Sequence, residues 1–244
     1  MITYAFVGPP LEAGPLPAFF YFSLSAEESL KLAPFNAPVL HLQEDPLRVF
    51  SFTIPGHGEG FDKHEAMDIW ADWAEKDSHF LFPFFEKVSE TIGNLIDKKI
   101  VDPNKMAIGG LSRGGFIATH IAAKEKRFST LLGYAPLTRL VTIEEFQRKK
   151  NPLFLKEMEK YDLSLLSEDL LHLRHLRFYI GNRDVRVSTD ACFAFIRTLS
   201  DVAYEKRTRE LTIEMNITPS IGYKGHGTSD ATFAEGANWI RALL

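Results

Sequence analysis

A short glycine-rich segment, residues 109–115, restricts the fold of this chain more than any other feature. It contains the pattern Gly-x-Ser-x-Gly with Ser112 at its centre, and a further glycine flanks the pattern on each side. An apolar run over residues 106–108 precedes the segment, and an apolar helical pattern begins near Phe116. A serine on a sharp turn between strand and helix needs strained backbone angles and small neighbours. The segment therefore predicts a strand, a tight turn that exposes the serine hydroxyl, and a helix.

Two other interpretations of this segment are weaker. A glycine-rich turn without chemistry would also contain doubled glycines, but the strand pattern before it and the helical pattern after it favour an exposed serine. A phosphate-binding loop would end in Gly-Lys followed by Ser or Thr, and the segment does not have this ending.

Apolar runs bounded by polar or turn residues predict six strands, at residues 17–24, 48–54, 105–109, 130–134, 176–180 and 211–218. Helical patterns lie at residues 116–126, 190–199 and 233–244. Strands that alternate with helices form a mostly parallel central sheet with helices on both faces. We therefore expect an α/β fold, in which functional residues lie on loops at the carboxyl ends of the strands.

The composition is that of one globular domain. The chain has 244 residues, 45% of them hydrophobic, and no segment has the composition of a linker, so we expect a single domain over residues 1–244. The net charge of -4 comes without a block of basic residues, which argues against nucleic-acid binding. No apolar stretch is long enough to span a membrane.

Two observations favour a cytoplasmic location. The single cysteine, Cys192, cannot form an intramolecular disulfide, and it lies in an apolar helical run typical of a buried structural thiol. The N-terminus lacks a basic region followed by an apolar run, so no signal peptide is predicted. The sequence leaves the oligomeric state open.

Residues 143–173 lie between two predicted strands and are too numerous for a simple crossover. They are rich in Leu, Phe and Met, and we predict that they form a helical cap whose apolar face lies over Ser112. Phe154 and Met158 are candidates for lining an acyl pocket, although aromatic residues at such spacing are also typical of plain core.

A serine nucleophile needs a histidine base, and the base needs a carboxylate to orient it. Asp184 directly follows the predicted strand 176–180, so it would lie at the carboxyl edge of the sheet beside Ser112. Asp190 is the nearest rival, but acids are favoured at a helix N-terminus for other reasons. His226 lies between two glycines after the last predicted strand and is the only histidine downstream of Asp184. A solvated turn aspartate and a plain surface histidine are the alternatives.

Two backbone N–H groups should hold the oxyanion that forms when a serine attacks a carbonyl. The Arg113 N–H lies at the start of the predicted helix, where the helix dipole also favours negative charge. The second N–H should come from the loop after the strand at residues 17–24, and the sequence leaves it open between Leu24 and Ser25.

No metal site and no cofactor are predicted. His172 and His175 are three residues apart, but no third ligand at a suitable spacing accompanies them. His57, Asp62 and His64 form a loose cluster that matches no recognised metal spacing.

Four arginines follow predicted strands, and all four should therefore lie near the carboxyl edge of the sheet. They are Arg113, Arg139, Arg183 and Arg186. Because an arginine can bind two oxygens of a carboxylate or phosphate at once, this placement predicts a positively charged pocket mouth that favours anionic acyl substrates. The alternative is that these arginines pair with nearby acids and serve the structure.

Several of these segments resemble one branch of the α/β-hydrolases, the serine esterases that are similar to dienelactone hydrolases and prolyl oligopeptidases. Residues 101–115 resemble the Val-Asp-Pro turn, the strand and the nucleophile turn of that branch, and residues 53–60 resemble its Pro-Gly-His-Gly turn. Residues 181–184 and 225–227 resemble its acid and base loops. The resemblance implies the α/β-hydrolase fold, with a helical cap inserted in it.

The sequence departs from that family in two places. The His-Gly pair that is common after the early strand is missing, and the loop there begins with Ser23. The N-terminus is short enough to lack one or both of the antiparallel strands that usually open the sheet. Dienelactone hydrolases use a cysteine at the nucleophile position, so Ser112 points to the esterase and peptidase side of the family.

The sequence thus predicts a serine hydrolase that cleaves a carboxylic ester or a related acyl bond of a small molecule through an acyl-serine intermediate. A thioesterase or a small serine peptidase remains open, and the peptidase is less favoured because no obvious acidic pair could hold a peptide amino terminus. The alternative outside the enzymes is a non-catalytic ligand-binding or regulatory protein on the same scaffold.

Overall fold

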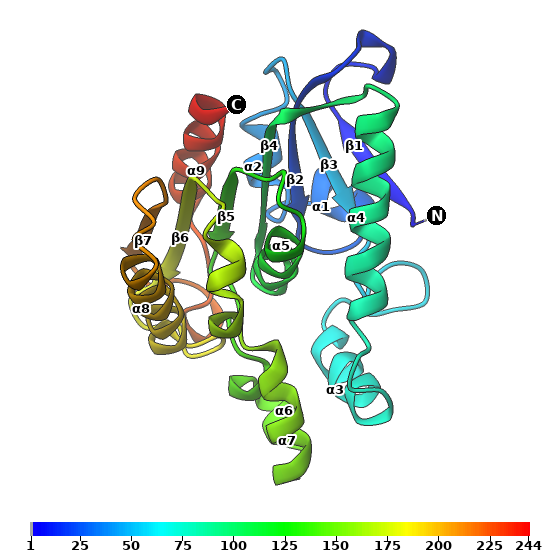
Figure 1. Ribbon diagram of the computed structural model, residues 1–244. Coiled ribbons are helices and arrows are strands. Elements are labelled where there is room, and N and C mark those ends of the chain that lie inside the picture. Colours follow the sequence, from blue (N-terminus) through cyan, green and yellow to red (C-terminus); the bar gives the residue numbers. More distant parts are fainter. Residues whose placement is uncertain (1) are drawn as a thin grey trace.

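A seven-stranded sheet runs through the centre of the computed structural model, which describes residues 2–244 (Figure 1). The strands stand in the order β1-β3-β2-β4-β5-β6-β7, with β1 antiparallel to β3 and every other neighbouring pair parallel. This arrangement confirms the predicted mostly parallel α/β sheet. The strands are β1 (Tyr4–Val7), β2 (Leu16–Phe22), β3 (Arg48–Phe52), β4 (Val101–Leu111), β5 (Thr130–Tyr134), β6 (His175–Gly181) and β7 (Thr212–Thr218).

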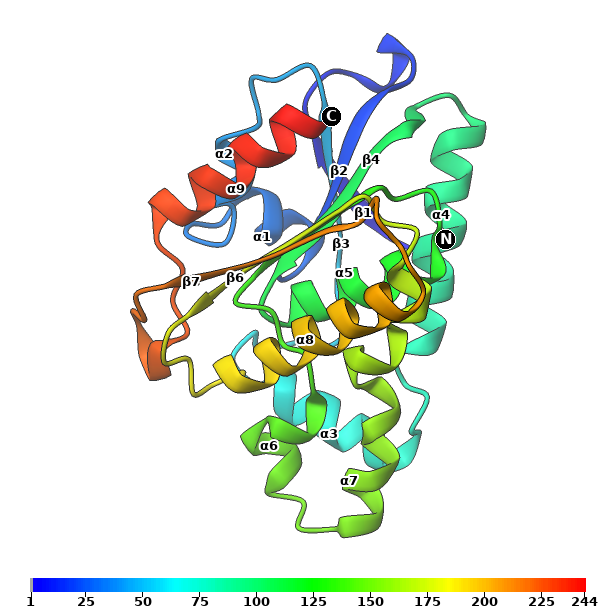
Figure 2. The ribbon, with the colours of Figure 1, turned by 60° about the vertical axis from the view of Figure 1, so that its left-hand side comes forward.

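Helices cover both faces of the sheet (Figure 2). Each face has its own apolar core, which explains why the central strands are continuous apolar runs rather than alternating ones. One face is covered by α1 (Ala26–Lys31), α2 (Ala37–Leu40) and α9 (Asp230–Leu243), and the other by α4 (Phe82–Asp97), α5 (Arg113–Lys124) and α8 (Thr189–Glu205). No helix described over residues 2–244 is both long and apolar enough to cross a membrane.

Three further helices extend beyond the carboxyl ends of the strands, at the bottom of Figures 1 and 2. We call them the cap helices: α3 (Ala66–Lys76), α6 (Glu144–Gln147) and α7 (Pro152–Met158). The remaining elements are 3-10 helices, η1 (Leu11–Ala13), η2 (Leu140–Thr142), η3 (Glu159–Tyr161), η4 (Leu163–Leu166), η5 (Glu168–Leu170) and η6 (Tyr223–Gly225).

The predicted cap, residues 143–173, does not project from the sheet as one unit. Its later part, η4 and η5, lies against α5 and α8 instead of projecting from the sheet, because its buried leucines join the core there. The cap also includes α3, from a different part of the chain, which lies beside α6. Arg148 and Asp68 join these two segments with a 2.9 Å ion pair.

All six predicted strands are present, and one more, β1, was not predicted. Its four residues are all half-buried, so they show no alternation of apolar and polar positions. β4 begins at Val101 rather than at residue 105, because Val101 already pairs with Leu16 of β2. Aromatic rings stack between neighbouring strands near the centre of the sheet, as between Phe20 and Phe50, whose centroids are 5.3 Å apart.

Candidate active site

The turn between β4 and α5 holds Ser112 in a strained conformation. Ser112 has a φ of 57° and a ψ of -120°, in a region that residues with side chains rarely adopt. A Cβ atom on Gly114 would overlap the carbonyl oxygen of Phe22 at the end of β2, and one on Gly110 would overlap the Gly114 backbone. The flanking glycines are therefore required by the close crossing of three backbone segments, as the sequence pattern indicated.

The structure brings together the three residues that the sequence singled out for catalysis. The Ser112 hydroxyl lies 2.8 Å from His226 Nε2, and His226 Nδ1 lies 2.7 Å from Asp184 Oδ2. The three residues follow β4, β7 and β6, so the carboxyl edge of the sheet positions all of them. Asp190, the rival acid, is exposed in the first turn of α8, where its charge suits the helix dipole.

The Asp184 side chain is fully buried and is oriented by the backbone around it. Its Oδ1 accepts the N–H groups of Arg186 at 2.9 Å and Val187 at 3.1 Å, which leaves Oδ2 to accept from His226. Thr189 supports the same turn, because its hydroxyl donates to the Gly181 carbonyl and accepts the Asp184 N–H. The carboxylate therefore has little freedom to turn away from the imidazole.

The two early-loop candidates for an oxyanion donor already have partners. The Leu24 N–H donates to Ser29 Oγ at 2.9 Å. The Ser25 N–H faces Glu28 Oε2 at 3.4 Å, as part of the capping box that begins α1. Both N–H groups therefore have side-chain partners, and the choice between Leu24 and Ser25 stays a prediction; the pattern Ser-x-x-Glu at residues 25–28 is the sequence signal for the Ser25 contact. Arg113 differs, because its N–H lies in the first turn of α5, where helices leave N–H groups without intrahelical partners.

A cavity of about 260 Å³ opens beside Ser112 and His226. Its wall is formed by the turns after β2, β4 and β6 and by the edge of the cap. The residues around it are Ser23, Leu24, Phe35, Lys63, His64, Met67, Leu111, Ser112, Arg113, Leu137, Ile143, Arg186, Val187 and His226. Phe154 and Met158, the predicted pocket residues, do not line it, because α7 turns both of them into the core. Met67 and Ile143 supply the apolar wall in their place.

Within residues 2–244, no three His, Cys, Asp or Glu side chains are placed to hold a metal ion. His57 is buried, and neither of its ring nitrogens has a hydrogen-bond partner in that part of the chain. Burial, with smaller effects of the positive charges of Arg113 and Lys63, lowers the pKa of His57 to about 3, so this ring is neutral.

Comparison with known proteins gives a family match and several similar folds. The model of the prolyl oligopeptidase family matches residues 85–243. Acetyl xylan esterase 1 from Thermoanaerobacterium sp. JW/SL YS485 has a TM-score of 0.66 and 15% identity, over 99% of this chain and 79% of that chain. Est1E from Butyrivibrio proteoclasticus, solved with ferulic acid bound, has a TM-score of 0.68 and 14% identity, over 99% and 95%.

A peptidase is also among the similar structures. Acylaminoacyl peptidase from Pyrococcus horikoshii has a TM-score of 0.65 and 13% identity, over 98% of this chain but only 38% of that chain. At these identities the similar structures show the fold, which is that of the α/β-hydrolases. No curated protein sequence matches the chain.

Proposed function

The chain belongs to the prolyl oligopeptidase family, and on that basis we propose that it is a serine esterase acting on small molecules through an acyl-serine intermediate. The observation that carries the proposal is the unbroken chain of hydrogen bonds from the buried Asp184 carboxylate through His226 to the Ser112 hydroxyl. A serine hydroxyl becomes a nucleophile when a histidine at this distance can accept its proton.

The reaction follows from the positions of these groups. Ser112 Oγ attacks the carbonyl carbon of the ester while His226 Nε2 accepts the hydroxyl proton. The protonated imidazole is stabilised by Asp184 and then gives its proton to the leaving alcohol as the tetrahedral intermediate collapses to the acyl-serine. Water, activated by the same imidazole, attacks the acyl-serine and releases the carboxylic acid and free Ser112.

The Arg113 N–H is the oxyanion donor that the geometry supports best. It lies at the N-terminus of α5, next to the nucleophile, where the helix dipole favours the developing negative charge. The Leu24 N–H can serve as the second donor if it exchanges Ser29 Oγ for the oxyanion, since a charged acceptor forms a stronger hydrogen bond than a neutral hydroxyl.

The cavity favours an ester over a peptide. A peptidase that binds a free peptide amino terminus needs acidic side chains there, and the residues that line the cavity include no Asp and no Glu. Its volume of about 260 Å³ lies below the range of roughly 300–1,000 Å³ typical of sites for drug-sized ligands, so it suits a short acyl group.

Hydrolysis of p-nitrophenyl esters of increasing acyl length tests this function. We expect activity on the shortest esters, a decline with acyl length, and a loss of many orders of magnitude in kcat for Ser112→Ala with the fold intact. Ser200→Ala, which alters a serine on α8 away from the cavity, is the matched control and should keep full activity. Activity of Ser112→Ala near that of the wild type would remove Ser112 from the mechanism. No hydrolysis of any ester or thioester by the wild type would favour a non-catalytic protein.

A further inference from the structure

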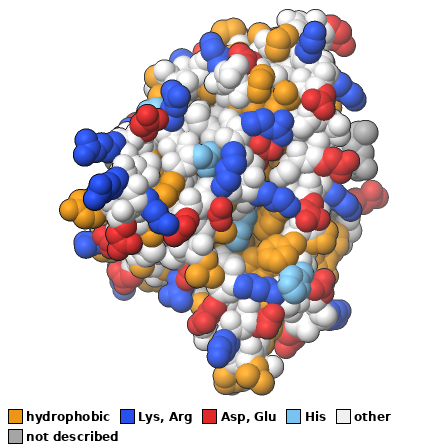
Figure 3. All heavy atoms as spheres, viewed as in Figure 1, with side chains coloured by type: hydrophobic (Ala, Val, Ile, Leu, Met, Phe, Trp, Pro, Cys, Tyr) orange, Lys and Arg blue, Asp and Glu red, His pale blue; other side chains and the backbone are white. Residues whose placement is uncertain are grey.

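The charge of the side chains around the cavity is all of one sign. Lys63, Arg113 and Arg186 line it, and no acidic side chain does. The outer surface is different, since Figure 3 shows acidic and basic side chains interspersed over the face that it presents. The side chains that line the cavity therefore carry positive charge and no negative charge, and the carboxylate that pairs with Arg186 lies behind the lining.

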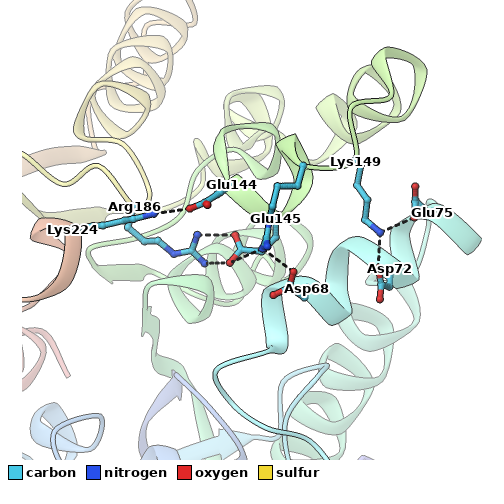
Figure 4. Close-up of polar contacts among 9 residues, drawn as sticks. Asp68, Asp72, Glu75, Glu144, Glu145, Lys149, Arg186 and Lys224 are labelled. Carbon is cyan, nitrogen blue, oxygen red and sulfur yellow. Dashed lines mark hydrogen bonds and ion pairs between the residues drawn. The ribbon is translucent and has the colours of Figure 1, made fainter.

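The four arginines that follow strands have different surroundings. Arg186 is held by Glu145 through two hydrogen bonds of 2.7 Å and 2.8 Å (Figure 4), and Arg139 pairs with Asp162 at 2.6 Å. Arg183 is exposed and lies outside the cavity. Within residues 2–244, Arg113 makes no ion pair with a carboxylate. Arg139 and Arg186 thus match the structural alternative of pairing with an acid, whereas Arg113, within the described residues, lines the cavity without such a pair.

Most hydrogen-bond donors of the Arg113 guanidinium have no partner within the described residues. A guanidinium carries five N–H groups, and within the described chain that of Arg113 makes a single hydrogen bond, from Nη2 to the Lys63 carbonyl at 3.1 Å. Its Nε is buried without a partner. Burial and the nearby positive charge of Arg186 together lower the pKa of Arg113 to about 10, and the negative charge of Glu145, which forms no ion pair with Arg113 within residues 2–244, opposes them only in part. A cation taken out of water without an anionic partner is costly, and an anion that enters the cavity would relieve that cost.

Lys63 adds a second cation that no carboxylate neutralises within residues 2–244. Its ammonium group lies 5.7 Å from the centre of the Phe35 ring, and both residues line the cavity. The neighbouring acid, Asp62, accepts the His64 N–H instead. An anion bound at Arg113 would therefore meet two positive charges on the same side of the nucleophile.

We propose that the ester substrate carries a carboxylate or phosphate close to the scissile bond, and that the Arg113 side chain binds it in this cavity. The proposal rests on the esterase function proposed above and names its substrate class. Arg113 and Ser112 line the same small cavity, so the anionic group and the carbonyl that Ser112 attacks must fit within it together. The planar guanidinium suits such a group because its N–H groups can meet two oxygens at once.

Matched pairs of rigid esters test the proposal. The first pair places the charge on the leaving group, 4-acetoxybenzoate against its neutral methyl ester. The second places it on the acyl group, 4-nitrophenyl hydrogen terephthalate against 4-nitrophenyl 4-methylbenzoate. In both anionic esters the para position prevents the carboxylate from attacking its own ester. The quantity measured is the ratio of kcat/KM for the anionic ester to that for its neutral partner.

We expect Arg113→Met to lower this ratio roughly tenfold to 100-fold in at least one pair, mainly through KM. The substitution keeps the Arg113 backbone N–H, so loss of the oxyanion donor does not confuse the result. Arg113→Lys should restore part of the ratio, and added salt should reduce it in the wild type. Arg197→Met, an exposed arginine on α8, is the control and should leave the ratio unchanged. An equal loss on both esters of each pair would show that Arg113 is structural and overturn the proposal.

A binding measurement keeps this proposal separate from the proposed hydrolysis. In Ser112→Ala, calorimetry should show that 4-acetoxybenzoate binds more tightly than its methyl ester, and that Arg113→Met removes the difference. Equal binding of the two esters would overturn the proposal even if the enzyme is an esterase. The same titration with 4-acetoxyphenyl phosphate distinguishes the two anions, since the group that binds more tightly is the one the cavity fits.

Discussion

The carboxyl edge of the sheet and the cap helices above it are held by different kinds of contact. At the edge, the Asp184 carboxylate is fully buried and accepts two backbone N–H groups as well as the His226 proton. In the cap, Lys149 on the α6 side reaches Asp72 and Glu75 of α3 at 2.5 Å and 2.7 Å, with both carboxylates largely in solvent. The difference implies that buried hydrogen bonds orient the side chains at the edge, whereas weak, salt-sensitive ion pairs add to the apolar contacts of buried residues such as Trp70 and Phe146 in holding the cap.

Two ion pairs cross from one region to the other (Figure 4). Glu145 of α6 holds Arg186, two residues after Asp184, and its neighbour Glu144 holds Lys224, two residues before His226. The Glu145 pair has two hydrogen bonds and is mostly buried, with its side chains 12% and 20% exposed. The Glu144 pair has a single contact and is more exposed. Two adjacent residues of α6 thus contact the loops that carry Asp184 and His226, and the contact to the Asp184 loop is the more buried of the two.

The largest effect should come from the buried edge. Asp184→Asn keeps the shape of the side chain but gives His226 Nδ1 no anion to face, and we expect kcat on a short neutral ester to fall on the order of 10⁴-fold. Asp190→Asn, at the exposed start of α8, is the matched control and should behave as the wild type. A loss below tenfold in Asp184→Asn would mean that the edge does not fix the chemistry as described.

His120 reports on how tightly the core helix α5 packs against η3, the segment that follows the cap helix α7. It lies on α5 against Phe85 and Phe116, and its Nε2 donates to the Tyr161 carbonyl of η3 at 3.2 Å. Burial lowers the pKa of His120 from 6.5 to about 4, opposed by a smaller effect of that hydrogen bond. Between these values the unfolded chain binds more protons than the folded one, so the free energy of unfolding should fall as the pH falls from 6.5 toward 4.

Substitution isolates this contribution. His120→Phe should reduce the slope of unfolding free energy against pH by up to about 1.4 kcal/mol per pH unit in that window. Urea denaturation at pH 7, 6 and 5 measures the slope for both proteins. An unchanged slope would show that His120 takes up its proton without unfolding, and that this junction is more open than its burial indicates.

The paired carboxylates of α6 sharpen the comparison. Glu145→Gln removes the charge that holds Arg186, so the acid loop should loosen and kcat should fall roughly tenfold. Glu144→Gln removes a more exposed pair, and we expect a change below about twofold. Steady-state kinetics on one short neutral ester measures both variants under the same conditions. Equal effects would mean that the burial of these pairs does not decide how far the cap supports the triad.

The smallest effect should come from the cap alone. Lys149→Met breaks the contacts to Asp72 and Glu75, which should cost no more than about 1 kcal/mol and lower Tm by roughly 2–4 °C. The difference in Tm from the wild type should shrink in 0.5 M salt, because salt weakens ion pairs between exposed charges. A larger fall in Tm that salt does not alter would show that the cap is held in the same way as the core.

The edge of the sheet could be predicted from sequence because local patterns determine it. Strand periodicity places the strand ends, parallel strands bring those ends to one edge, and the order of Ser112, Asp184 and His226 along the chain leaves few other choices. The donor in the early loop stays open between Leu24 and Ser25, because the sequence shows a helix start signal at residues 25–28 but not which N–H group would turn to a substrate.

The cap could not be predicted in the same way. Its contacts join segments about 80 residues apart, such as Arg148 with Asp68. No sequence pattern in either segment indicates that the two are in contact. Phe154 and Met158 fit a pocket wall and a core equally well by spacing, and only the direction of α7 decides between the two. Periodicity shows that a helix has an apolar face, but it does not show what that face packs against.

Labelling with a fluorophosphonate probe, followed by mass spectrometry of the peptides, tests the central claim most directly. The probe reacts with a serine whose hydroxyl an adjacent base activates, so Ser112 should carry the label, and labelling should slow at least roughly 100-fold in Asp184→Asn and in His226→Ala. An unlabelled Ser112, or one labelled at the same rate in all three proteins, would contradict the account that the buried edge of the sheet activates this serine.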